Sequence, residues 1–162
     1  MKGAIRVLLV GAAAGYLAGQ AMDKATTWYY GRQSDASKQR ENELLPEGAP
    51  LAAARRLAGL VGAEPTDEQA GKLALSMHQS LGQLYGVVAA ALTRRGVAPL
   101  KAGLASGVGG FLLVDELANS LFFTPPPQAY PAESHLRGVI GHLTFGAVTG
   151  ALMAVAKGLR LL

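Results

Sequence analysis

Long apolar stretches alternate with shorter polar segments along the chain. The apolar stretches cover residues 3–22, 73–92, 102–123 and 136–156. At a rise of about 1.5 Å per residue, roughly 20 residues of helix cross a hydrocarbon core of about 30 Å. The pattern therefore predicts an all-α, polytopic membrane protein in which residues 1–162 form one domain of four transmembrane helices.

Glycine pairs recur at helical spacing in all of these stretches. Residues four apart lie on one helix face, so each pair forms a flat strip that a second helix backbone can approach closely. An interior glycine costs a helix in water about 1 kcal/mol relative to alanine, whereas small residues hold helices together in lipid. The predicted packing residues are Gly11, Gly15, Gly19, Gly82, Gly86, Gly103, Gly107, Gly146 and Gly150. Because these faces exceed what one bundle needs internally, we expect a homo-oligomer or a subunit of a membrane complex.

The composition agrees with a membrane protein. Half of the residues are hydrophobic, 16% are charged, and 21 of 162 are glycine, whereas soluble domains have about 25% charged residues and about 7% glycine. The alternative is a soluble helical bundle with an alanine-rich core. The net charge of +4 could indicate nucleic-acid binding, but no such motif is present. The basic residues mostly flank the apolar stretches, where anionic lipid attracts them, so we expect a lipid bilayer as the partner and no nucleic acid.

The distribution of basic residues predicts the orientation. Lysine and arginine are dense in the short segments at both termini and around residues 94–101. By the positive-inside rule, this places both termini in the cytoplasm. The first apolar stretch could also be a signal peptide, but Arg6 interrupts it, so we expect a retained first helix.

The polar segment 31–66 is predicted to form an outer loop. Residues 34–50 carry no apolar periodicity, so we expect them to be irregular. Residues 51–61 place leucine and valine at helical spacing beside two arginines, which predicts a short amphipathic helix on the membrane surface. Thr66 and Gln69 predict a capping box that opens the second long helix.

Polar side chains from several predicted helices fall at a similar depth near the outer end. They are His78, Asp115, Glu116, Asn119, His135, Arg137 and His142. A charged group in hydrocarbon costs roughly 2.5–3.5 kcal/mol on insertion scales, so such groups normally face the bundle interior and meet partners. We therefore expect a cluster of histidines and carboxylates in the outer half of the membrane.

Three interpretations of this cluster stay open. It could be a structural network in which Arg137 or a histidine neutralises Asp115 or Glu116. It could respond to protons or ions, because histidine can change its charge between about pH 5 and 8. It could also hold zinc, iron or copper through the histidines and one carboxylate, although the spacing matches no known metal signature and no other cofactor is predicted. The sequence has no phosphate-binding loop, nucleophile elbow or His-Glu-x-x-His motif, so nothing favours an enzyme.

Several segments resemble the YagU-like family of bacterial inner-membrane proteins. They are the stretch 113–119 with its Asp115-Glu116 pair, Thr124 followed by three prolines, the stretch 135–142 with both of its histidines, the glycine-rich first helix ending in Met22-Asp23, and the region of His78 with Gly82 and Gly86. The resemblance covers most of the chain outside residues 34–65. It implies a multi-pass protein of the bacterial inner (cytoplasmic) membrane, from a group sometimes associated with acid stress and without an agreed activity.

These observations predict a non-enzymatic integral inner-membrane protein. It would act either as a scaffold or subunit, or as a proton-responsive protein of the acid-stress type, through its polar cluster. The alternative is a small membrane protein that binds or transports a metal or another ion with the same cluster.

Overall fold

The computed structural model describes residues 2–162, and all regular structure in this range is helical, which confirms the all-α prediction. Three helices are long: α1 (Lys2–Tyr30), α4 (Asp67–Arg94) and α7 (Ala132–Gly158). A fourth helical run joins α5 (Pro99–Gly110), the π-helix η1 (Phe111–Ala118) and α6 (Asn119–Phe122) without a break. The shorter elements are α2 (Asp35–Leu44), α3 (Ala49–Gly59) and the 3₁₀ turn η2 (Pro127–Ala129).

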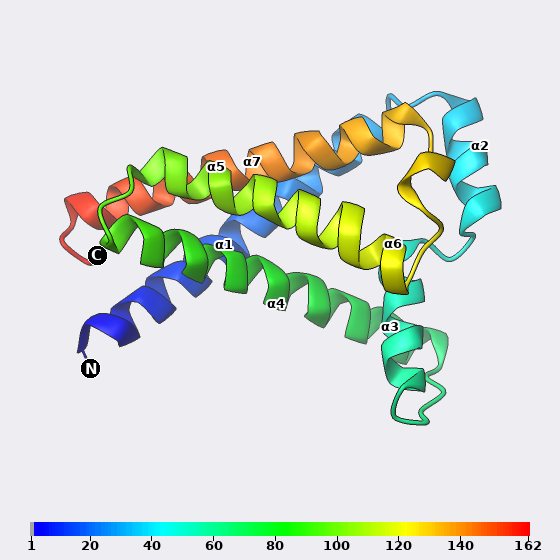
Figure 1. Ribbon diagram of the computed structural model, residues 1–162, viewed down its shortest axis with the longest axis horizontal. Coiled ribbons are helices and arrows are strands. Elements are labelled where there is room, and N and C mark those ends of the chain that lie inside the picture. Colours follow the sequence, from blue (N-terminus) through cyan, green and yellow to red (C-terminus); the bar gives the residue numbers. More distant parts are fainter. Residues whose placement is uncertain (1) are drawn as a thin grey trace.

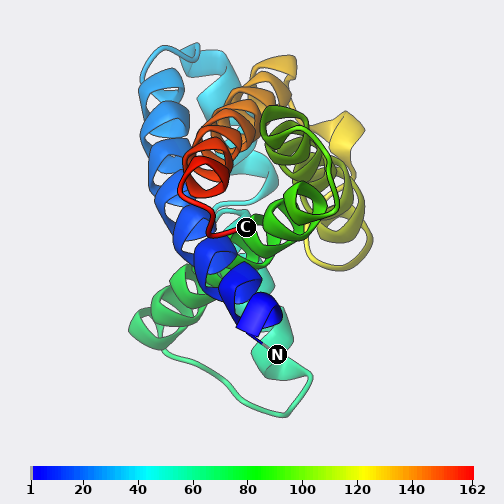
Figure 2. The same cartoon turned by 90° about the vertical axis from the view of Figure 1, so that its left-hand side faces the viewer.

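The four helical runs lie side by side along the long axis of the molecule (Figure 1). Helix α1 packs against α4 and α7, and α5 packs against α4 and α7. Both termini lie at one end, and α2, α3 and α6 lie at the other (Figures 1 and 2). We call the second end the capped end, because α2 and α3 cross it.

Glycines allow α1 and α4 to approach closely. A Cβ atom added at Gly15 would overlap the carbonyl oxygen of Gly82, and one added at Gly86 would lie 2.6 Å from the Cα of Gly15. One added at Gly11 would lie 2.5 Å from the Cα of Val87. Since real Cβ atoms do not approach so closely, these positions require glycine.

A second set of glycines lies between α5 and α7. A Cβ atom at Gly103 would lie 2.7 Å from the Cα of Gly150, and one at Gly107 would lie 3.1 Å from the Cα of Gly146. Gly19 differs, because a Cβ atom there would meet nothing within 4 Å. Apart from Gly19, the predicted packing glycines thus contact other helices of the same chain. They therefore no longer give a reason to expect a second copy.

Small side chains fill the interior, and large ones cover the outside. The buried apolar residues of the described chain are mostly alanine, with Phe145 and Met153 among the few large ones. Leu9, on α1, is 67% exposed, and Leu84, on α4, is 57% exposed. Many further leucines of the long helices are exposed in the same way. A soluble protein normally places its large apolar residues inside, so this arrangement is the reverse of a water-soluble core.

Two helices are long and apolar enough to cross a membrane. They are α1 from Gly3 to Tyr30 and α7, Ala132–Gly158. The predicted second span lies within α4, which begins with Asp67 and Glu68, and the predicted third span is divided by η1. The four-span arrangement therefore stays a prediction.

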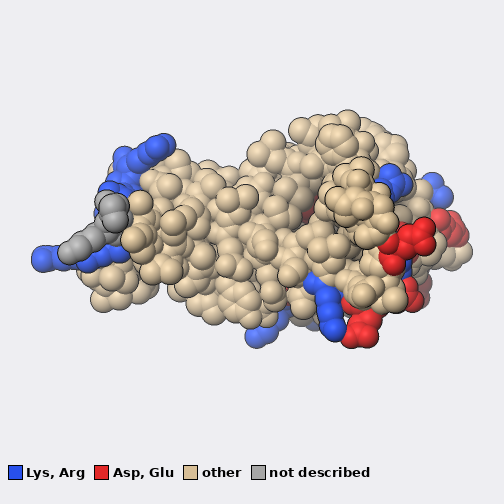
Figure 3. Space-filling view, turned by 90° about the horizontal axis from the view of Figure 1, so that it is seen from below, with Lys and Arg blue, Asp and Glu red and all other residues tan. Residues whose placement is uncertain are grey.

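Charged residues gather at the two ends of the molecule. On the face shown in Figure 3, lysine and arginine mark the end that holds the termini, and charges of both signs mark the capped end. The stretch between them is largely uncharged on this face. The capped end also carries the histidines and carboxylates of the predicted cluster.

The expectation of an irregular segment at residues 34–50 was wrong, because α2 occupies Asp35–Leu44. Ser34 caps this helix, its Oγ accepting a hydrogen bond from the Ser37 amide at 3.3 Å, and such caps stabilise helix starts. The helix has no apolar stripe for a periodicity argument to detect. It is instead held in place through polar contacts with α7.

Helix α3 covers most of the segment in which we expected an amphipathic helix. It buries Ala52, Ala53 and Ala54 and packs against α4. Just after it, Leu60 and Val61 are 80% and 83% exposed. The capping box of Thr66 and Gln69 is confirmed, with both reciprocal hydrogen bonds present.

Candidate functional site

A cavity of about 570 Å³ opens at the capped end, between α1, α2, α3, α4, η1 and α7. This volume lies within the range of about 300–1,000 Å³ that is common for ligand sites. Six of the predicted cluster residues line it: His78, Asp115, Glu116, Asn119, His135 and Arg137. The seventh, His142, lines a smaller cavity deeper in the bundle, which shares His78 and Asp115 with the larger one. The structure thus brings the predicted residues to one connected region.

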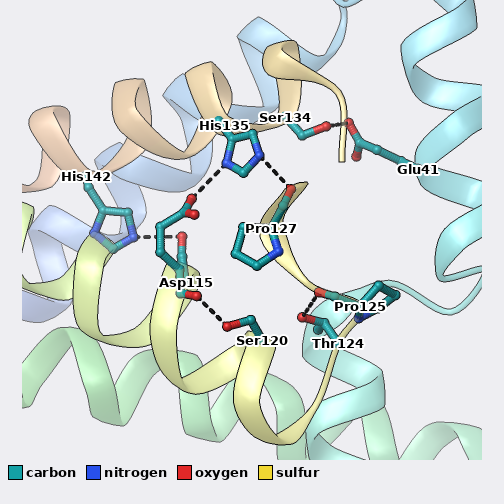
Figure 4. Close-up of polar contacts among 10 residues, drawn as sticks. Glu41, Asp115, Ser120, Thr124, Pro125, Pro127, Ser134, His135 and His142 are labelled. Carbon is teal, nitrogen blue, oxygen red and sulfur yellow. Dashed lines mark hydrogen bonds and ion pairs between the residues drawn. The ribbon is translucent and has the colours of Figure 1, made fainter. Parts of the chain in front are cut away.

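Two histidines of α7 contact the two adjacent carboxylates of η1. His142 Nε2 lies 3.0 Å from Asp115 Oδ2, and His135 Nδ1 lies 2.8 Å from Glu116 Oε1. Figure 4 labels His142, Asp115 and His135 and marks with dashed lines the contacts that run from the two histidines to η1. Because each pair joins two elements, its hydrogen bond helps to fix η1 against α7.

The π-helical geometry of η1 accounts for this arrangement. Adjacent residues of an α-helix point about 100° apart, so the sequence alone does not show which of Asp115 and Glu116 points inward. In η1 the backbone is wound more widely, with i→i+5 hydrogen bonding, and both carboxylates reach α7. Short π-helical segments inside α-helices are frequent at functional sites.

His135 lies between two oxygen atoms that accept hydrogen bonds. Its Nδ1 faces Glu116, and its Nε2 lies 3.0 Å from the carbonyl oxygen of Pro127 in η2 (Figure 4). A neutral imidazole has one N–H donor and one bare nitrogen, so it can donate to only one of these oxygens. Both contacts are satisfied when the pair holds one further proton, either on the imidazole or on the carboxyl group of Glu116.

The third histidine forms a separate pair. His78 Nε2, on α4, lies 2.9 Å from Asp23 Oδ1, on α1. Each histidine of the described chain therefore meets its own carboxylate on another element. Within residues 2–162, no three histidine, aspartate or glutamate side chains converge in a way that could hold a metal ion.

Arg137 does not neutralise Asp115 or Glu116, which was one expectation for it. Its guanidinium instead donates to Glu41 Oε2 at 2.7 Å and to Gln33 Oε1 at 2.8 Å. Gln33 lies in the α1–α2 connection, and Glu41 lies on α2 and lines the cavity. This contact holds α2 against α7.

Glu41 lines the cavity and is a residue of the candidate site that sequence reasoning missed. Burial would raise the pKa of its carboxyl, but hydrogen bonds from Arg137, Ser134 and Gln33 outweigh that effect and hold the pKa below its ordinary value of 4.5. The Ser134 hydroxyl donates at 2.6 Å (Figure 4). No local pattern could reveal this contact, because Glu41 and Arg137 lie 96 residues apart in the sequence.

Comparison with known proteins gives no match, whether to a protein-family model, a curated protein or a solved structure. The resemblance to the YagU-like family therefore stays a prediction. The function has to be argued from the geometry of the cavity.

Proposed function

We propose that this chain is a non-enzymatic integral membrane protein whose capped end responds to protons. In this proposal the four helical runs cross the bilayer, and both termini lie on the cytoplasmic side of a bacterial inner membrane. Small residues between the helices and leucines on the outside support it, since helices in lipid associate by close packing rather than by burying large apolar side chains. The largely uncharged stretch between two charged ends also supports it (Figure 3).

One observation carries the proton response, namely the position of His135 between two hydrogen-bond acceptors. The site accommodates one proton more than a neutral imidazole and an ionised Glu116 provide together. When that proton leaves, His135 can donate to Glu116 or to the Pro127 carbonyl but not to both. The other contact then loses its hydrogen bond.

Loss of either contact changes the wall of the cavity. Glu116 belongs to η1, and Pro127 belongs to the segment that connects α6 to α7, and both line the cavity. Other charged groups near His135 are Glu41, from α2, and Arg137, from α7, which pair with each other. The pairs His142–Asp115 and His78–Asp23 lie on the adjoining helices. Protonation therefore acts on a contact between elements, which is what a pH-dependent conformational change requires.

A spin label on Asn119 tests this proposal. The chain has no cysteine, so Asn119→Cys gives a single labelling site on the cavity wall beside η1. We expect its electron paramagnetic resonance spectrum to differ between about pH 5 and 8, the interval in which histidine ordinarily titrates. We expect the difference to disappear in the His135→Gln background.

A label at Leu60→Cys, which lies outside the cavity and is exposed, serves as the control and should give the same spectrum at both pH values. A spectrum at Asn119 that does not change with pH would rule the proposal out. So would a change that persists without His135.

The structure gives less support to the metal-binding alternative. The histidines form three separate pairs with different carboxylates rather than one set of ligands.

A further inference from the structure

The cavity at the capped end carries an excess of negative charge. Its lining contains four carboxylates, Glu41, Glu47, Asp115 and Glu116, and one guanidinium, Arg137. Glu41 faces Arg137 at 2.7 Å, and Glu47 faces Arg55 at 3.0 Å, so each of these two charges has an arginine partner. Arg55 also pairs with Asp67, outside the cavity.

Asp115 and Glu116 have no such compensation, because their partners are histidines. A neutral imidazole donates a hydrogen bond without adding a positive charge. Hydrogen bonds from neutral imidazoles of His135 and His142 thus leave the negative charges of Glu116 and Asp115 in place. The side chain of Asp115 is 38% exposed and lines both cavities. The negative charge of the site is therefore centred on the floor of the cavity, at η1.

The walls around this floor are apolar and aromatic. Phe111 lies on η1 beside the carboxylates, and Tyr130, Met77 and Leu81 also line the cavity. Aromatic faces attract cations as well as apolar groups. The site thus has a carboxylate at its floor and an apolar, partly aromatic wall beside it.

We propose that this cavity binds an organic cation with a bulky apolar body. The cationic centre pairs with Asp115, and the apolar body lies against Phe111 and the neighbouring wall. An inorganic cation fits less well, since Ca²⁺ takes about 6–8 oxygen ligands and the described residues bring no three metal-ligating side chains together. This inference deepens the proposed function, because its cation would occupy the same cavity whose wall the His135 proton alters.

The test uses two probes of the same shape and opposite charge, tetraphenylphosphonium and tetraphenylborate. Binding of each to the full-length, detergent-solubilised chain is measured by equilibrium dialysis at one pH, with detergent micelles alone as the blank. We expect the phosphonium to bind at least about tenfold more tightly than the borate, since a charge in a partly desolvated site strongly favours its opposite.

The variant Asp115→Asn removes the negative charge at nearly constant shape. We expect it to weaken phosphonium binding about tenfold or more. The matched control is Asp35→Asn, because Asp35 lies on α2 with a fully exposed side chain and does not line the cavity. It should leave the affinity unchanged.

Equal affinity for the two probes would overturn the inference, and so would phosphonium binding that does not depend on Asp115. The comparison of the two probes uses the unaltered chain, so it decides the question even where Asp115→Asn fails to fold. A pH-dependent spectrum at Asn119 without phosphonium binding would remove this inference and leave the proposed function standing. Phosphonium binding with a pH-independent spectrum at Asn119 would remove the proposed proton response and leave the cation-binding inference standing.

Discussion

At the scale of single residues, the capped end is organised by pairs that join different elements. His78, His135 and His142 each meet a carboxylate from another helix, and Arg137 meets Glu41. Depth along the helices suffices to predict that most of these residues gather. It does not predict which side chains form pairs, because this depends on how each helix is rotated about its axis. For Asp115 and Glu116 it also depends on the π-helical winding of η1.

The pair of Arg137 and Glu41 should contribute measurably to stability. Both side chains are largely buried, at 26% and 14% exposure, so Arg137→Met would leave a buried carboxylate without its charged partner. We expect a loss of about 1.5–3 kcal/mol in the free energy of unfolding, the range for hydrogen bonds to charged groups. Unfolding in a denaturing-detergent titration, followed by circular dichroism, measures it.

The control for this prediction is Arg40→Met on α2, the helix that carries Glu41. Arg40 lies 3.7 Å from Glu43, with both side chains about half exposed, and exposed pairs contribute at most about 1 kcal/mol. Equal losses in the two variants would contradict the role assigned to Arg137.

The same pair predicts how stability depends on acid pH. The pKa of Glu41 is lowered in the folded chain, so its contribution is fully present above the ordinary glutamate value of 4.5 and is lost as the pH falls through the folded-state pKa. We expect Glu41→Gln to reduce the loss of stability on acidification below that value. Unfolding midpoints of the wild type and Glu41→Gln, measured as the pH is lowered below 4.5, give this loss. Identical dependence on pH in the two proteins would refute the role of Glu41.

At the scale of elements, the periodicity of glycine and leucine is sufficient to place the long helices and their contact faces. It fails for α2, whose sequence carries no apolar stripe and whose position depends on α7. It also fails for η1, since a stretch such as Phe111–Ala118 reads as ordinary α-helix in an apolar pattern. Local patterns predict an element when its own apolar face holds it, and they miss an element held by distant polar partners.

Glycines in close helix contacts and glycines in open space should differ in how alanine changes the stability of the chain. Gly86→Ala would bring a Cβ atom onto the α1 backbone, 2.6 Å from the Cα of Gly15, and overpacking of this kind costs about 1–3 kcal/mol. Gly19→Ala meets nothing within 4 Å and gains helix propensity of up to about 1 kcal/mol. We therefore expect the first variant to be less stable than the wild type and the second to be equal or more stable, by thermal unfolding in detergent. Equal effects would mean that α1 and α4 do not meet through Gly86.

At the scale of the whole molecule, the termini share one end and the cavity opens at the other (Figures 1 and 2). Two helices, α1 and α7, are long and apolar enough to cross a membrane. Helix α4 begins with charged residues, and the remaining run is divided by η1. The four-span topology predicts that the α3–α4 turn faces the side opposite to the termini.

Single cysteines in this cysteine-free chain test the topology. Leu60→Cys, beyond α3, should react with a membrane-impermeant maleimide applied to the outside of intact spheroplasts. Val97→Cys, between α4 and α5, and Leu161→Cys should react only after lysis. Labelling of all three from the outside would contradict the four-span arrangement.

The most direct test of the proton response is nitrogen NMR of the protein labelled at its histidine side chains. His135 is assigned by the signal that disappears in His135→Gln. At about pH 5, where histidine is ordinarily charged, we expect both ring nitrogens of His135 to form hydrogen bonds and an extra proton to reside on the ring or on Glu116. By about pH 8, one of the two hydrogen bonds is lost, and the nitrogen shifts change accordingly. A His135 signal that keeps one neutral tautomer and the same hydrogen bonds across this interval would rule out the proposed proton response.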